Sequence, residues 1–88
     1  MTLNIRKHGV FKRDIKRIRR THDLSRLNQV IEMLVTGGKL DVRYNDHSLT
    51  GNWKGYRECH IRPDWPLIYR IVGDELQLAR TGSHSELF

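Results

Sequence analysis

Three strand-like runs occupy the second half of this 88-residue chain, and the short connections between them restrict its fold more than any other feature. Residues 56–61, 67–72 and 75–81 carry the alternating or continuous apolar patterns that are typical of β-strands. The connections, residues 62–66 and the dipeptide Gly73-Asp74, are too short for a crossover to a parallel partner. The three runs are therefore predicted to pair as an antiparallel meander.

The first half of the chain predicts one strand and two helices. Apolar and polar residues alternate over residues 3–7, which indicates a short strand. Over residues 10–21 the apolar residues recur every three or four positions, the spacing of one helix face. A broader apolar stripe over residues 24–35 predicts a second helix, which Gly37 ends.

These elements predict an α+β domain with the order β-α-α-β-β-β. In this arrangement a helical hairpin packs on one face of a mostly antiparallel four-stranded sheet. A chain of this length holds one core, so residues 1–88 are predicted to form a single domain. Residues 40–53 lack a clear period and are rich in Asp, Asn, Ser and Gly, which predicts a long loop suited to a functional role.

The chain is strongly basic, with 16 Lys and Arg residues against 10 Asp and Glu and a net charge of +6. Arginine, the commoner of the two cations here, binds phosphate through a planar fork of two donors. The charge favours a nucleic acid or an acidic protein as partner, with a surface kept basic for solubility as the alternative. On the helix over residues 10–21, phosphate contacts are predicted for Arg13, Arg17 and Arg20, although a solvated helix face explains the same pattern.

Disulfide-linked, secreted and membrane proteins find no support in the sequence. The single cysteine, Cys59, excludes an internal disulfide and lies in a strand-like run, which predicts a buried thiol. No apolar stretch approaches the ~20 residues of a membrane span. No N-terminal segment combines a basic start with an apolar run. We therefore expect a cytoplasmic protein without a membrane partner.

Candidate functional residues surround the first connection of the meander. The segment His60–Trp65 places an imidazole, a guanidinium, a carboxylate and an indole within six residues. If the last two strands form a hairpin, Arg80 lies near the start of the preceding strand, and His84 follows it closely. His47 is within reach from the long loop. The catalytic residues predicted on this basis are His47, His60, Asp64, Arg80 and His84.

Strand alternation also predicts which side chains share a face of the sheet. Glu58 and His60 lie on one face of their strand, and Leu76, Leu78 and Arg80 on one face of the last strand.

This set of residues suits cleavage of RNA without a metal, because RNA carries its own nucleophile in the 2′-hydroxyl. The reaction needs a base for that hydroxyl, an acid for the leaving 5′-oxygen and positive charge near phosphorus. Histidine suits either proton transfer, Asp64 suits a base or a group that orients an imidazole, and Arg80 supplies charge. Trp65 and Phe88 offer rings on which bases stack. No cofactor is required, and the residues alone leave open which group is acid and which is base.

Each of these residues also has a structural interpretation. Arg80 can serve only as the ion-pair partner of Glu58 or Asp64, Trp65 as a core residue, and Phe88 as a clamp for the tail. The three histidines with Asp64 also suit Zn²⁺, although no two of them show the close spacing of metal ligands.

Three ordered motifs carry a resemblance to a known family. D-H-x-L-x-G-x-W-x-G-Y-R begins at Asp46, H-x-x-P-D-W-x-L-I-Y at His60, and R-T-G-x-H-x-x-L-F at Arg80. They cover roughly the second half of the chain and resemble the YafQ branch of the RelE superfamily of bacterial toxins.

The resemblance implies a toxin of a type II toxin-antitoxin system that cleaves mRNA in the ribosomal A site. It implies an acidic cognate antitoxin, the ribosome with its RNA, and operator DNA bound by the antitoxin complex as partners. The alternative is a non-catalytic protein: a basic nucleic-acid-binding module, or a toxin fold that acts only as an antitoxin-binding co-repressor. The residues to which the resemblance assigns function are His47, His60, Asp64, Trp65, Arg80, His84 and Phe88.

Overall fold

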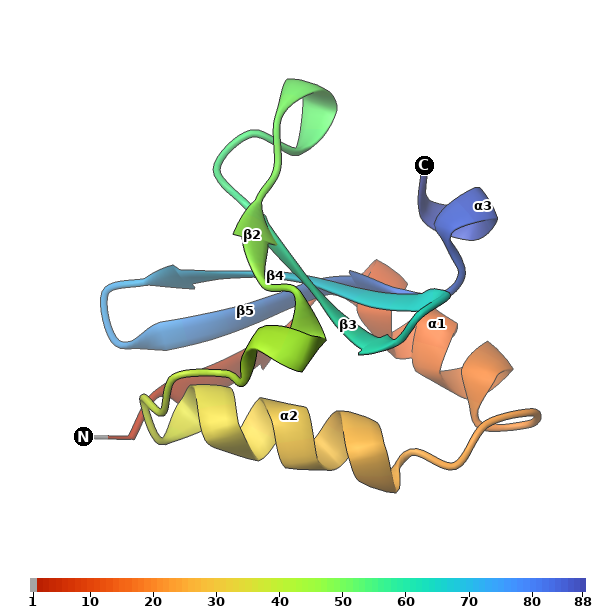
Figure 1. The fold of residues 1–88 in the computed structure, drawn as a ribbon, viewed down its shortest axis with the longest axis horizontal. Coiled ribbons are helices and arrows are strands. Elements are labelled where there is room, and N and C mark those ends of the chain that lie inside the picture. The colour runs from red at the N-terminus through yellow and green to blue at the C-terminus, as the bar shows by residue number, and fades with distance from the viewer. Residues whose placement is uncertain (1) are drawn as a thin grey trace.

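Five strands form one sheet in the order β1-β5-β4-β3-β2 in the computed structural model, which describes residues 2–88 (Figure 1). β1 pairs with β5 in parallel, and every other neighbouring pair is antiparallel. The predicted α+β class is confirmed, but the four-stranded sheet is wrong, because the two-residue β2 adds a fifth strand at the edge of β3. The strands are β1 (Asn4–Lys7), β2 (His47–Ser48), β3 (Arg57–Arg62), β4 (Trp65–Val72) and β5 (Glu75–Thr81).

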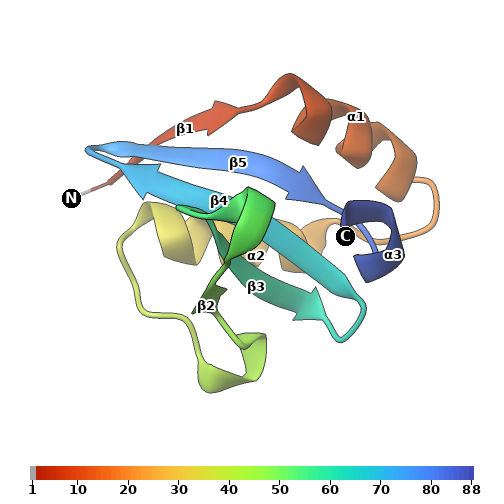
Figure 2. The ribbon, with the colours of Figure 1, turned by 90° about the horizontal axis from the view of Figure 1, so that it is seen from above.

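Two helices cover one face of the sheet, as the sequence predicted. Phe11 and Ile18 of α1 and Leu27 of α2 are buried in one cluster with side chains of β3, β4 and β5. Seen from above, α1 runs beside β5 and α2 lies behind the sheet (Figure 2). None of the helices within residues 2–88 is long and apolar enough to cross a membrane. The helices are α1 (Gly9–Ile18), α2 (Ser25–Val35) and α3 (His84–Leu87), with 3₁₀ turns η1 (Val42–Tyr44) and η2 (Gly51–Trp53).

The opposite face of the sheet carries a smaller apolar cluster. Ile68 of β4, Ala79 of β5 and Leu87 of α3 are buried together there, and Leu49 packs against them. In Figure 1, α3 and the loop that contains η2 lie on this side of the sheet, away from α2. The cluster therefore anchors the two segments that flank the polar residues described next.

The connection between β3 and β4 is shorter than predicted. Arg62 pairs with Trp65, so only Pro63 and Asp64 lie between the paired residues. The register shifts between His60 and Arg62, which marks a bulge just before the turn. Asp64 consequently lies at the tip of a tight hairpin.

Candidate active site

Polar side chains gather on the sheet face opposite α1 and α2. His47 of β2 lies directly across from Glu58 of β3, and Glu58 lies across from Ile68 of the smaller cluster. Alternate residues of a strand share a face, so His60 lies beside Glu58. The first residue of α3, His84, approaches from the C-terminal segment. The structure thus brings together the three predicted histidines.

Glu58 lies at the centre of this group, which we call the histidine cluster: His47, His60 and His84 around Glu58. The Oε1 atom of Glu58 is 2.9 Å from His60 Nε2 and 3.8 Å from the Nε2 atoms of both His47 and His84. Glu58 is only 4% exposed, so its carboxylate interacts with these rings in a desolvated environment. The sequence reasoning placed Glu58 beside His60 but did not include it among the site residues.

Asp64 orients His84 from the tip of the β3–β4 turn. Its Oδ1 atom accepts hydrogen bonds from His84 Nδ1 at 3.0 Å and from the His84 backbone N–H at 3.2 Å. These two hydrogen bonds hold the pKa of the exposed Asp64 carboxyl below its usual value, and the one from the His84 side chain has the larger effect. The opposite ring atom of His84, Nε2, is 3.2 Å from His60 Nε2.

The hydrogen-bond partners fix where protons lie on the neutral rings. Because Asp64 is an acceptor only, His84 carries its proton on Nδ1 and presents a lone pair at Nε2. His47 likewise donates Nδ1–H to the carbonyl of Asn45 at 2.9 Å. His60 donates Nε2–H to Glu58, and its buried Nδ1 has no hydrogen-bond partner among residues 2–88. The site therefore contains two carboxylate–imidazole pairs, Asp64–His84 and Glu58–His60.

A capping box holds α3, and with it His84, against the sheet. The Ser83 hydroxyl accepts a hydrogen bond from the Glu86 backbone N–H, and the Glu86 carboxylate accepts one from Ser83 N–H at 2.9 Å. Arg17 of α1 pairs with the same carboxylate at 2.9 Å. Leu87 is buried in the smaller cluster, so the short helix is fixed at both ends.

Arg80 is held by a residue that the sequence reasoning did not consider. Asp14 of α1 is 1% exposed, and it accepts hydrogen bonds from Arg80 Nε at 3.1 Å and Nη2 at 3.0 Å. The predicted alternative, pairing of Arg80 with Glu58 or Asp64, is wrong because Asp14 occupies both donors of the fork. These hydrogen bonds raise the pKa of Arg80. Asp14 also accepts a hydrogen bond from the Thr81 backbone N–H.

A bulge in β5 changes the face on which Arg80 lies. Leu78 pairs with Tyr69 on the helix-covered face, but Arg80 pairs with Ile68, so Ala79 is an extra residue in β5. Strict alternation with Leu78 was therefore a wrong prediction, and the bulge places Arg80 across from Ile68. Because Ile68 is also paired with Glu58, Arg80 lies two strands from the histidine cluster, about 10 Å between backbones.

Trp65 does not offer a surface for base stacking in this structure. Its side chain is 3% exposed, and its indole N–H donates to the Thr81 hydroxyl at 2.8 Å. The His22 ring packs 4.9 Å away between ring centroids. This burial disagrees with the stacking role predicted for Trp65 and agrees with its alternative as a core residue, since the indole lies in one buried cluster with Ile18 and Leu67.

Phe88 and the three arginines predicted to bind phosphate, two in α1 and Arg20 just after it, lie on the surface and do not contact the cluster in the same way. Phe88 is 57% exposed, and its ring lies 6.0 Å from that of His84 at an angle of 30°. Arg17 is tied to Asp14 and Glu86, whereas Arg13 and Arg20 are exposed and have no carboxylate within 4.0 Å among residues 2–88. None of these arginines contacts a histidine of the cluster.

The cluster also has the donor atoms of a metal site. One ligand atom each from Glu58, His60 and His84 lies within 4.8 Å of the other two. This set differs from the predicted one, since Glu58 takes the place of His47 and Asp64. Carboxylate oxygen and imidazole nitrogen both suit Zn²⁺ or Cu²⁺.

Solved structures of bacterial toxins are similar to the whole chain. A copper-bound mutant toxin from Helicobacter pylori is 46% identical and has a TM-score of 0.90, covering 98% of this chain and 99% of that one. A chain of the Escherichia coli DinJ-YafQ complex is 38% identical with a TM-score of 0.89, covering 98% of both. The fold is therefore that of a small bacterial toxin.

Curated sequences narrow this class to one family. The mRNA interferase toxin YafQ of Escherichia coli K12 is 39% identical over 82 residues, which are 91% of this chain and 89% of that protein. A family model described as "Bacterial toxin of type II toxin-antitoxin system, YafQ" matches residues 3–88. The chain therefore belongs to the YafQ family of type II toxins, which confirms the resemblance found in its motifs.

Proposed function

We propose that this chain is an mRNA endoribonuclease, the toxin of its toxin-antitoxin pair, and that residues 1–88 act as one toxin domain. The observation that carries the proposal is the pair of carboxylate–imidazole groups, Asp64–His84 and Glu58–His60, whose Nε2 atoms face each other at 3.2 Å. The name of the curated relative, mRNA interferase toxin, supports the same reaction. An mRNA substrate implies that the protein acts in the cytoplasm.

The two pairs suit the two proton transfers of RNA cleavage. His84 Nε2, with its Nδ1–H held by Asp64, takes the proton of the 2′-hydroxyl, and that oxygen forms a bond to phosphorus. The bond from phosphorus to the 5′-oxygen breaks, and protonated His60 gives its proton to that oxygen. Glu58 compensates the positive charge that His60 carries before the transfer. The products are a 2′,3′-cyclic phosphate and a 5′-hydroxyl.

His47, Arg80 and Phe88 complete the proposed site. His47 lies across the cluster from His84 and can donate to the phosphate once it is protonated. Arg80 supplies fixed positive charge two strands away from the cluster, with its guanidinium oriented by Asp14. Phe88 presents an exposed ring next to His84, on which the base beside the cleaved bond can stack.

Changing His84→Ala tests this assignment. Loss of a general base lowers the rate by about 10²–10⁴-fold, so cleavage of mRNA, mapped by primer extension, should fall by that factor. His8→Ala is the matched control, because His8 lies at the start of α1 and not in the cluster. A folded His84→Ala protein that cuts at the normal rate, or a substrate with a 2′-deoxy sugar at the cut that is still cleaved, would reject the mechanism.

Dependence on the ribosome is part of the proposal and needs its own measurement. The small site has an exposed side at Asp64 and His84, open to a strand that another particle holds in place. Cleavage of one mRNA should be at least about tenfold faster with purified ribosomes than without them. Equal rates would show that the toxin cuts free RNA.

We also propose an acidic antitoxin as the protein partner, and its complex with the toxin as the operator-binding form. The net charge of +6 favours an acidic segment. The solved Escherichia coli structure contains YafQ with DinJ, which supports the same kind of assembly. A small acidic protein encoded next to this chain should copurify with it at low salt and abolish cleavage.

A metal-dependent hydrolase is the second candidate, favoured by the Glu58–His60–His84 donor set and by the copper in the toxin from Helicobacter pylori. Under our mechanism a bound divalent metal occupies the Nε2 atoms that move protons, so added Zn²⁺ should inhibit cleavage and EDTA should leave it intact. Loss of cleavage in EDTA, restored by Zn²⁺, would instead establish the hydrolase.

A further inference from the structure

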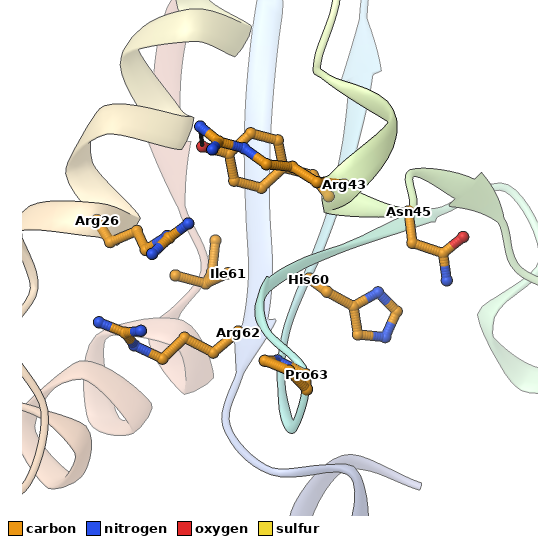
Figure 3. Close-up of a pocket in the computed structure, with 8 residues that line it drawn as sticks. Arg26, Arg43, Asn45, His60, Ile61, Arg62 and Pro63 are labelled. Carbon is orange, nitrogen blue, oxygen red and sulfur yellow. Dashed lines mark hydrogen bonds between the residues drawn. The ribbon is translucent and has the colours of Figure 1, made fainter.

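Three arginines from three separate elements line a pocket at the edge of β3 (Figure 3). Arg26 belongs to α2, Arg43 to η1 and Arg62 to the end of β3. The pocket has a volume of about 340 Å³, and His60 also lines it. Figure 3 shows the three guanidinium groups on one side of β3 and the His60 ring on the other side of the same strand.

The positive charge of this pocket has no ion-pair partner within residues 2–88, and the Asp23 carboxylate interacts with Arg62 only at longer range. No carboxylate of residues 2–88 lies within 4.0 Å of Arg26, Arg43 or Arg62, and no acidic residue lines the pocket. Arg57 and Arg80, in contrast, are paired with aspartates. Like charges that converge on one concave surface repel each other, so the pocket favours an anion as its occupant.

One of the three guanidinium groups is already held in place. Arg43 lies over the ring of Tyr44, 5.0 Å from its centroid, and donates from Nη2 to the Tyr44 hydroxyl at 3.1 Å. Tyr44 itself is buried, so it gives Arg43 a rigid support. A guanidinium that is oriented before binding loses less side-chain entropy when it contacts a ligand.

The edge of β3 provides a path from the histidine cluster to the pocket. β2 pairs only with Arg57 and Glu58, so over residues 59–62 no other strand of the described chain pairs with that edge, and η1, which packs against β3, borders it. An RNA strand whose cleaved bond lies at His60 can cross this edge towards the arginines. The pocket and the cluster share His60, so the next phosphate along the strand has a cationic site beside it.

We propose that the pocket formed by Arg26, Arg43 and Arg62, the arginine pocket, binds a backbone phosphate of single-stranded RNA next to the cleaved bond. This inference rests on the proposed function. The guanidinium fork matches phosphate oxygens, and the walls formed by Ile61 and Pro63 suit the apolar face of a ribose or base. A carboxylate of an acidic protein has similar chemistry, but the shared His60 favours the substrate strand.

The test compares two triple variants in binding to uncleavable RNA. One removes the pocket charges (Arg26→Gln, Arg43→Gln, Arg62→Gln), and the control removes three exposed charges outside the pocket and outside α1 (Lys7→Gln, Lys39→Gln, Lys54→Gln). The probe is a fluorescent single-stranded RNA with 2′-O-methyl groups throughout, followed by anisotropy as salt increases from about 20 to 200 mM.

The expected result is a pocket-specific loss of salt-dependent binding. Loss of one phosphate contact lowers the slope of log K against log salt by about 0.7, so the pocket variant, which loses one bound phosphate, should lose about 0.7 in slope. If the two proteins bind equally at 1 M salt, that slope corresponds to an affinity about fivefold lower at 0.1 M. The control variant should keep its slope within about 0.2, since scattered surface charges are screened. Arg62→Gln alone should also lower the slope, by less than about 0.7, which keeps the test valid if the triple variant fails to fold.

Several results would overturn the inference. Equal losses in the two triple variants would show that only net charge matters, and a wild-type protein that fails to bind the RNA at low salt would remove the site. Reduced binding of polyglutamate with unchanged RNA binding would assign the pocket to an acidic protein. Because the probe is uncleavable, RNA bound through the pocket by a protein that cuts no mRNA would reject the proposed function alone.

Discussion

Replacing Asp14 with asparagine tests whether one buried carboxylate holds Arg80 and the end of β5 in place. Asp14 accepts four hydrogen bonds: two from Arg80, one from the Thr81 backbone N–H and one from Arg17 at 3.2 Å. The introduced side-chain amide would have the same shape as the carboxylate but no charge, and its NH₂ group would face a donor. Arg80 would then lose its partner while its own charge stays in place.

The size of the effect follows from the burial of the two side chains. Removing one partner of a fully buried ion pair costs about 3–5 kcal/mol in the free energy of unfolding. The Arg80 side chain is 26% exposed, so water compensates part of its charge and we expect about 2–3 kcal/mol. An 88-residue domain unfolds with an entropy of about 0.18 kcal/mol/K, so Tm should fall by about 11–16 °C.

Thermal unfolding followed by circular dichroism measures this shift, and a double-mutant cycle assigns it to the pair. The cycle combines Asp14→Asn with Arg80→Gln, and we expect a coupling free energy of at least about 1 kcal/mol. Asp74→Asn is the control, because Asp74 lies in the exposed β4–β5 turn and should change stability by less than about 0.5 kcal/mol. A coupling below about 0.5 kcal/mol, or a Tm shift no larger than that of the control, would refute the reasoning.

Three further predictions concern acid titration, the cysteine and the C-terminal helix. The pKa of Asp64 is depressed in the folded protein, so its contribution to stability is present at neutral pH and is lost as pH falls through that lowered pKa. In His84→Ala, NMR titration should show the Asp64 pKa return towards its usual value, and an unchanged value would contradict the pairing. Burial raises the pKa of the Cys59 thiol, so iodoacetamide should modify it only after denaturation, and rapid modification of the native protein would disprove its burial. Ser83→Ala removes the capping box, which should lower the free energy of unfolding by about 1 kcal/mol in thermal unfolding and slow cleavage because His84 is displaced. The control Ser85→Ala should change neither the stability nor the cleavage rate.

Elements with a strong hydrophobic period were predictable from the sequence. β5 has the predicted bounds, α2 begins one residue later than predicted, and β3 is shifted by one residue at both ends. α1 ends at Ile18, earlier than predicted, because the last apolar residue of its stripe is also its last buried one. The start of β4 was misplaced since Trp65 and Pro66, assigned to the turn, pair with β3.

Short or irregular features left no comparable signal. β2 has only two residues, too few for any period, yet its pairing brings His47 opposite Glu58. The bulge at Ala79 depends on pairing with β4, which no local pattern in β5 encodes. Asp14 did leave a signal, because it lies three residues after Phe11 and four before Ile18, on the apolar stripe of α1. A carboxylate in that position indicates a buried partner, and Arg80 is that partner.

The contacts of Asp14 and Arg17 change how the basic face of α1 has to be interpreted. Arg17 pairs with Asp14 and with Glu86 of the α3 capping box, so it supports both Arg80 and the helix that carries His84. Loss of Arg17 would therefore reduce cleavage without any contact to RNA. Arg13 of α1 and Arg20 just after it have no such ties among residues 2–88, so of the three predicted arginines only these two can report whether this surface binds phosphate. A variant that combines all three arginines cannot distinguish a catalytic toxin from a non-catalytic nucleic-acid-binding module, whereas Arg13→Gln with Arg20→Gln can.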